Sequence, residues 1–244
     1  MVAAERAHGD SLEVSADSPE ALDEVFWRVF EGDAYLKNNS LMPHSVPSET
    51  IEKLRAYVGA VLTTSDVKRY LSKNNNNILR LTSLRGAFPN AVLLIPYRGP
   101  VDHAGSLLRQ HAHFTEIHAG DRFAGQYMQW LAHHEFGSDH RPFGLGQVPS
   151  GTPDTAEYWV SLWSSVYDWL LETAPDDAIF VSYEALCSDP GVWEALAARL
   201  EVPAETTTDG GFRRSARAYT TDIPTDVLAR AEAIHDRLNA RSIG

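Results

Sequence analysis

The chain has 244 residues, of which 43% are hydrophobic, so it is long enough for one sizeable folded domain and too apolar for a disordered chain. Its formal net charge of −12 argues against a large nucleic-acid-binding surface, and a bound anion would need a local group of basic side chains. The single cysteine, Cys187, excludes an internal disulfide and a multi-cysteine zinc site, and the N-terminus lacks a signal-peptide core, so we expect a cytoplasmic protein without membrane contact.

The N-terminal half is predicted to be mainly helical. We expect residues 1–17 to be poorly ordered and residues 18–244 to form a single domain. Ser18 and Pro19 are a typical helix cap and first helical residue, and apolar residues recur at helical spacing from there to Gly32. The elements expected in this half are helices at 18–31, 49–62 and 78–88 and a short strand at 70–72.

Two apolar runs further along the chain predict strands. Residues 91–97 are continuously apolar, as expected for a strand covered on both faces in a parallel sheet, and residues 178–183 predict a second buried strand. The other expected elements are helices from after Pro100 to about 114 and at 121–136, 154–173, 190–200 and 225–240, with a loop at 137–152. Strands separated by helices predict an α/β fold, a three-layer α/β/α sandwich with a parallel sheet.

The turn after the first strand carries the clearest chemical signal. Arg98 ends the strand, Gly99 and Pro100 turn the chain, and a helix begins. Ligands of parallel α/β sheets lie beyond the carboxyl ends of strands, and a helix N-terminus attracts anions. Arg98, with Ser106 two helical turns further on, therefore indicates an anion site, with a phosphate monoester as the preferred ligand. The competing interpretation is a surface ion pair at Arg98 and a small packing residue at position 106.

Two stretches of the sequence resemble bacterial PAPS-dependent sulfotransferases. The first has a lysine before a helix, then "FP-x-A", a strand, "R-x-P" and a serine eight residues past the arginine; its residues are Lys73, Phe88-Pro89-Asn90-Ala91, Arg98-Gly99-Pro100 and Ser106. The second resembles "V-x-Y-E-x-L-x-x-D-P" and runs from Val181 to Pro190. The resemblance covers roughly residues 18–240, and the two motifs are specific only in combination.

The resemblance implies a fold, a cofactor and a set of site residues. The fold would be of the P-loop nucleoside triphosphate hydrolase type, in its sulfotransferase form. The donor would be PAPS, with adenosine 3′,5′-bisphosphate as product and a hydroxyl or amine of a small molecule or carbohydrate as acceptor. Arg98 and Ser106 would bind the 3′-phosphate, and Lys73 would lie near the transferred group. Arg213 or Arg214, in a late glycine-rich loop, would cover the nucleotide phosphate, although a plain surface loop explains them equally well.

The proton-accepting base is open at the level of sequence. Glu20, Asp23, Glu24 and His44 are candidates, but acidic residues in a first helical turn are also ordinary partners of the helix dipole. Seven of the ten histidines fall between His103 and His140. Without a H-E-x-x-H motif we favour partly exposed helix histidines over a metal site.

One part of the family pattern is missing. The first strand and its "P-x-S-G-T" phosphate-binding loop should precede the acidic helix, and nothing before Ser18 matches them. The sequence therefore leaves open either a truncated chain or the loss of half the donor pocket. The alternatives to a sulfotransferase are a non-catalytic remnant that binds a nucleotide or a protein, and a nucleotide-sugar or phosphate-ester enzyme that uses Arg98 differently.

Overall fold

The computed structural model describes residues 23–65, 68–204, 212–214 and 222–243. Near the N-terminus it also describes the backbone of two short strands that pair antiparallel, β1 (Ala4–Glu5) and β2 (Glu13–Val14). The predicted disorder of 1–17 falls largely outside the described residues, and so does the predicted helix start at Ser18. None of the helices in the described part of the chain is both long enough and apolar enough to cross a bilayer.

The N-terminal half is helical, as predicted. Its elements are α1 (Asp23–Tyr35), α2 (Ser48–Ser65), the 3-10 helix η1 (Asn75–Arg80) and α3 (Leu81–Ala87). The first helix was expected to end at Gly32, but it continues past this glycine to Tyr35. The strand predicted at 70–72 is wrong: Tyr70 and Ser72 donate hydrogen bonds to the Asp23 carboxylate instead of pairing with a strand.

The sheet consists of three parallel strands in the order β3-β4-β5. Both predicted strands are present, and a third, formed by the end of the chain, was not predicted. The strands are β3 (Leu94–Tyr97), β4 (Ile179–Ser182) and β5 (Ser242–Ile243). In the register of β3 against β4, Leu94 lies opposite Ile179 and Tyr97 opposite Ser182.

Burial differs between the two longer strands. All four residues of β4 are buried, as predicted for a strand covered on both faces. On β3 the burial alternates, with Ile95 and Tyr97 inside and Leu94 39% exposed, so the predicted burial on both faces is wrong there. Alternating burial means that one face of β3 is left partly uncovered: the cluster that covers Ile179 and Val181 of β4 on that side of the sheet does not include Leu94.

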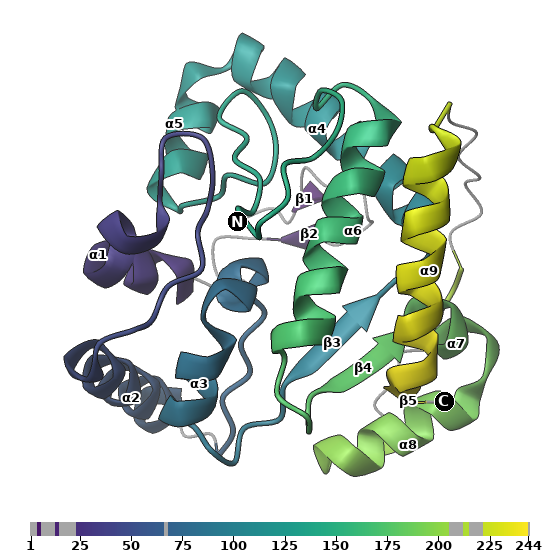
Figure 1. Ribbon diagram of the computed structural model, residues 1–244. Helices are drawn as coiled ribbons and strands as arrows, with labels where there is room; N and C mark the ends of the chain where they lie inside the picture. The colour runs from purple at the N-terminus through teal and green to yellow at the C-terminus, as the bar shows by residue number, and fades with distance from the viewer. Residues whose placement is uncertain are drawn as a thin grey trace.

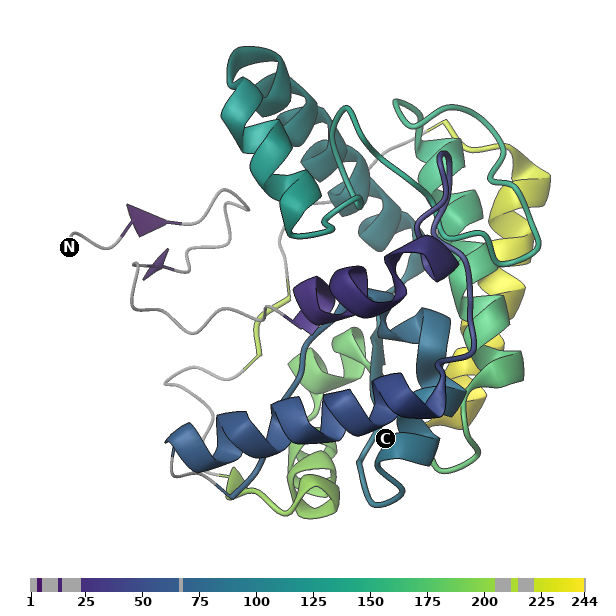
Figure 2. The same ribbon diagram turned by 90° about the vertical axis from the view of Figure 1, so that its left-hand side faces the viewer.

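Helices pack on both faces of the sheet, which makes the fold α/β as predicted (Figures 1 and 2). Phe180 of β4 points into a core shared with three long helices, while Ile179 and Val181 pack against Val192 and Leu196 on the opposite face. The described helices after β3 are α4 (Pro100–Gly120), α5 (Arg122–Trp130), α6 (Ala156–Thr173), α7 (Tyr183–Ser188), α8 (Pro190–Leu200) and α9 (Thr225–Arg241).

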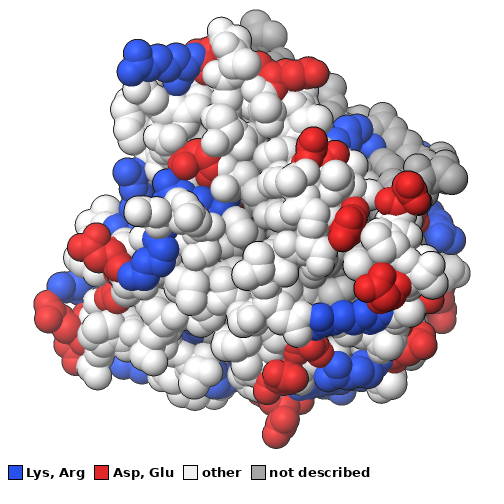
Figure 3. All heavy atoms as spheres, turned by 45° about the horizontal axis from the view of Figure 1, so that its top comes forward, with Lys and Arg blue, Asp and Glu red and all other residues white. Residues whose placement is uncertain are grey.

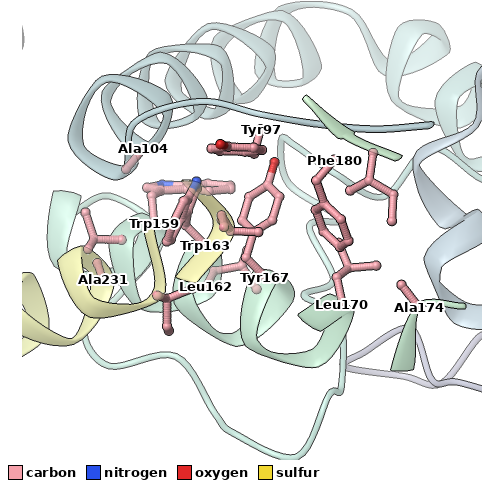
Figure 4. Close-up of a cluster of buried hydrophobic side chains, with 14 of the residues drawn as sticks. Tyr97, Ala104, Trp159, Leu162, Trp163, Tyr167, Leu170, Ala174, Phe180 and Ala231 are labelled. Carbon is pink, nitrogen blue, oxygen red and sulfur yellow. The ribbon is translucent and has the colours of Figure 1, made fainter. Parts of the chain in front are cut away.

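The main core is rich in aromatic side chains. Figure 4 shows Tyr97 of β3 beside Trp163 and Tyr167 of α6, with Phe180 of β4 next to them. The Tyr167 hydroxyl donates a 3.0 Å hydrogen bond to the carbonyl of Pro96, so a buried polar group ties α6 to β3. This core fixes the carboxyl end of β3, and with it the position of Arg98.

Candidate functional site

The carboxyl ends of β3 and β4 lie side by side, and α4 and α7 begin there. Arg98 follows β3 directly. Its guanidinium lies 5.2 Å from the ring centroid of Tyr183, the first residue of α7. The side chain is 17% exposed, and its Nε and Nη2 are buried without a hydrogen-bond partner in the described part of the chain. A charged donor that leaves buried hydrogen-bonding capacity unused is the kind of group that donates hydrogen bonds to a ligand oxygen.

The carboxylate of Asp102 lies close to two of the arginines that were predicted to bind phosphate. Asp102 lies 3.8 Å from Nη2 of Arg98 and 3.9 Å from Nη2 of Arg214. Ser106 is one helical turn after Asp102 on α4, so it lies on the same face of that helix. The structure therefore brings Arg98 and Arg214 to one carboxylate, while the Ser106 hydroxyl accepts a 3.5 Å hydrogen bond from Arg109 of the same helix.

Arg213 reaches this place through its backbone. Its carbonyl accepts a 2.6 Å hydrogen bond from the Tyr183 hydroxyl. Tyr183 thus contacts Arg98 through its ring and the segment of Arg213 and Arg214 through its hydroxyl. The sequence had left open whether these two arginines belong to a site or to a plain surface loop.

The N-terminus of α4 offers fewer free donors than the sequence implied. The Gly99 N–H donates a 3.0 Å hydrogen bond to the Glu184 carboxylate, and Pro100 has no N–H. The other oxygen of Glu184 lies 3.2 Å from the Ser182 hydroxyl. Glu184 therefore links the ends of β3 and β4, and an anion bound here would depend on the arginines more than on the helix end.

A second group of predicted residues lies around the start of α1. Glu24 is 3% exposed, accepts a 2.7 Å hydrogen bond from Asn74 and forms a 3.0 Å ion pair with Arg80. Asp23 accepts hydrogen bonds from Tyr70 and Ser72. Both carboxylates thus hold the segment before η1 against α1, and this role occupies the groups that the sequence offered as bases.

The other candidates for catalysis are placed as follows. Lys73 is exposed and adjoins Asn74, next to the Glu24 carboxylate. His44 stacks on Tyr35 at 5.3 Å, and burial lowers the pKa of its imidazole, with Arg80 adding to the effect. Neither ring nitrogen of His44 has a hydrogen-bond partner in the described structure, and both are inaccessible. Glu20 lies outside the described residues.

Three of the seven histidines between His103 and His140 are buried by packing or paired with a neighbouring side chain. His140 lies 2.8 Å from the Tyr158 hydroxyl, and burial lowers its pKa to about 4. His134 pairs with Asp139 at 2.9 Å. Burial also lowers the pKa of His103 to about 4, and the nearby Arg98 contributes to this. Within the described residues, no three His, Cys, Asp or Glu side chains converge in a way that would hold a metal ion.

Charge is not concentrated on the face that Figure 3 turns forward. The centre of this face is mostly uncharged, and acidic and basic side chains lie mainly toward its margins. The net charge of −12 is therefore not gathered into one acidic patch on this face.

Four residues near Arg98 or near the start of α1 were not among the candidates read from the sequence. Asp102 and Glu184 lie within the quoted motifs but were not assigned a role. His133 and Glu135 pair at 3.6 Å close to Lys73, and their only sequence signal is a charged cluster directly after a helix.

No protein-family model, curated protein or solved structure matches this chain.

Proposed function

We propose that this chain is a PAPS-dependent sulfotransferase of the P-loop-like fold type, which transfers a sulfuryl group to a hydroxyl or amine acceptor. The observation that carries the proposal is Arg98, whose buried Nε and Nη2 have unused hydrogen-bonding capacity at the carboxyl end of a parallel strand. A phosphate oxygen would satisfy these donors. The alternative of a non-catalytic nucleotide-binding remnant uses the same site and differs only in turnover.

The arrangement around Arg98 supports a phosphate monoester as ligand. Arg214 approaches the same Asp102 carboxylate as Arg98 and offers a second guanidinium, and Ser106, one helical turn after Asp102 on α4, offers a hydroxyl. At 3.8 Å the Asp102 carboxylate is too far from Arg98 for a hydrogen bond. It therefore holds Arg98 only weakly, and a phosphate could take its place. Among the described strands β3 is at a sheet edge, which is compatible with the further strand that the resemblance implies.

The test is calorimetric titration of adenosine 3′,5′-bisphosphate. Arg98→Ala should weaken binding by about 1.5–3 kcal/mol, because a charged hydrogen bond to phosphate is lost. Affinity for adenosine 5′-monophosphate, which lacks the 3′-phosphate, should change little. Arg237→Ala is the matched control, since Arg237 is 52% exposed and pairs with Asp168 on another side of the fold.

A second variant tests whether the Asp102 carboxylate weakens the binding of the bisphosphate. Asp102→Asn should tighten bisphosphate binding by roughly 0.5–1 kcal/mol, because it removes a partly exposed carboxylate that competes for Arg98 and Arg214. Equal affinities of wild type and Arg98→Ala would remove Arg98 from the site. Binding without turnover of PAPS would favour the remnant.

A further inference from the structure

His133 and Glu135 lie on the turn that follows α5. The chain leaves α5 through Ala132, a non-glycine residue with φ of 57°. The His133 N–H donates to the Met128 carbonyl at 2.9 Å and the Ala132 N–H to the Gln129 carbonyl at 3.1 Å, which is a Schellman motif. Left-handed backbone is costly for alanine, so the turn is held by its surroundings.

Contacts from two other segments fix this turn. Arg28 of α1 donates a hydrogen bond to the Trp130 carbonyl at the end of α5. Asn75, two residues after Lys73, donates to Glu135 Oε1 at 3.4 Å. The pair therefore lies beside the lysine that the resemblance places near the transferred group.

The pair has the accessibility and the polarity of a proton acceptor. Nδ1 of His133 is 3.6 Å from Oε2 of Glu135, and the two side chains are 41% and 20% exposed. The charged groups that act on the ring are Glu135 of the same turn, Glu24 of α1 and Lys73. Their combined effect raises the pKa of His133, mainly through Glu135, while burial and Lys73 oppose the increase.

We infer that His133, oriented by Glu135, accepts the acceptor's proton in the proposed sulfuryl transfer. The inference rests on the proposed function. It replaces the candidates read from the sequence, because Glu24 is committed to Arg80 and the ring nitrogens of His44 are inaccessible. A histidine with a carboxylate at one nitrogen and solvent at the ring is the usual form of a general base.

The step balances with the groups named. The acceptor O–H proton moves to Nε2 of His133 while the acceptor oxygen forms a bond to sulfur. The bond between sulfur and the bridging oxygen of PAPS breaks, and its electron pair stays on the phosphate of adenosine 3′,5′-bisphosphate. Lys73 offsets the charge that develops on this leaving oxygen, and Glu135 stabilises the imidazolium.

The experiment is the pH dependence of sulfuryl transfer from PAPS to a panel of phenol and alcohol acceptors, together with bisphosphate titration. His133→Gln should lower turnover by about 10²–10⁴-fold without changing bisphosphate affinity. His113→Gln is the matched control, because His113 is an exposed histidine on α4. Wild-type turnover should rise with pH as His133 loses its proton, and Glu135→Gln should move this rise to lower pH while reducing the plateau.

A measurement that needs no turnover tests the pair itself. The imidazole NMR signals of His133 should titrate above the usual histidine pKa in the wild type and at a lower pH in Glu135→Gln. An unchanged midpoint in that variant would overturn the pairing. A merely structural pair would leave the pH profile of turnover unmoved.

The outcomes separate the two proposals. Turnover in His133→Gln equal to that in His113→Gln would overturn the base assignment and leave the donor site intact. A wild type that binds the bisphosphate but never turns over would remove the transfer and its base while keeping the nucleotide site. A wild type that does neither would remove both.

Discussion

Arg80 is buried between two aromatic rings, and this arrangement decides what Glu24 does. Its guanidinium lies 4.5 Å from the Trp27 ring centroid and 4.9 Å from that of Tyr35, and its side chain is 0% exposed. Glu24 is its partner at 3.0 Å. Burial and the adjacent Glu24 carboxylate raise the pKa of Tyr35, so its hydroxyl stays neutral in this cluster.

Breaking this buried pair should destabilise the fold strongly. We expect Glu24→Gln to lower the free energy of unfolding by about 3–5 kcal/mol, because it leaves the buried guanidinium without a counter-charge. The double variant with Arg80→Met should lose less than the two single variants together. Urea unfolding measures all three.

The control for this prediction is an exposed ion pair on α2. Glu49→Gln breaks the pair between Lys53 and Glu49, which are 43% and 78% exposed, and should leave stability almost unchanged. A Glu24→Gln protein as stable as Glu49→Gln would show that Glu24 does not hold Arg80. In that case Glu24 would return as a candidate base.

At the scale of elements, helix ends explain how the chain is redirected. α8 ends at Glu201, an exposed residue with φ of 52°, where the Val202 N–H donates to the Ala197 carbonyl at 3.0 Å. The same Schellman geometry at Ala132 places the His133–Glu135 pair. In both places a non-glycine residue takes the left-handed conformation that glycine adopts without strain.

Glu201→Gly should therefore stabilise the protein. The gain should be about 0.5–1 kcal/mol, since the left-handed strain is relieved by more than glycine's extra flexibility costs in the unfolded chain. Arg69 hydrogen-bonds to the carbonyl of residue 201, so this contact is kept. Glu194→Gly inside the same helix is the control and should cost about 1 kcal/mol. A loss of thermal stability in Glu201→Gly would contradict the assignment of this helix end.

At the scale of the whole molecule, buried histidines couple stability to pH. The folded-state pKa of His103 and of His140 is lowered to about 4, mainly by burial, whereas the unfolded chain has the usual value near 6.5. Between these values the unfolded state binds protons that the folded state does not, so stability falls as pH falls. His44, His111 and His134, whose pKa is also lowered by burial, act in the same direction.

We expect the free energy of unfolding to drop from pH 7 to pH 5. The slope should approach about 1.4 kcal/mol per pH unit for each of His103 and His140. His133 has a raised pKa and acts in the opposite direction, but its exposure makes its contribution smaller. Denaturant unfolding at several pH values measures the slope, and His140→Gln should flatten it. A stability that is equal at pH 7 and pH 5 would refute this account.

How much the sequence predicted depends on whether a feature is local. The helices at 49–62, 154–173 and 190–200 follow from the period of their apolar residues and both longer strands from short apolar runs, and the structure confirms them. The strand at 70–72 was wrong because Asp23, far away in the sequence, accepts the hydrogen bonds of Tyr70 and Ser72. The exposure of Leu94 was missed because the cover over a strand's face is set by how helices pack on the sheet, not by the strand's own residues.

The site shows the same division. The sequence by itself determined that Arg98 follows a strand and precedes a helix, because these depend on apolar spacing and on Gly99 and Pro100. Only the tertiary structure decided that Arg214 and Asp102 lie beside it, that Glu184 takes the Gly99 N–H, and that Glu135 contacts Asn75, two residues after Lys73. The physical reason is that each of these contacts joins side chains from separate elements, and their distance is set by how the core packs rather than by spacing along the chain.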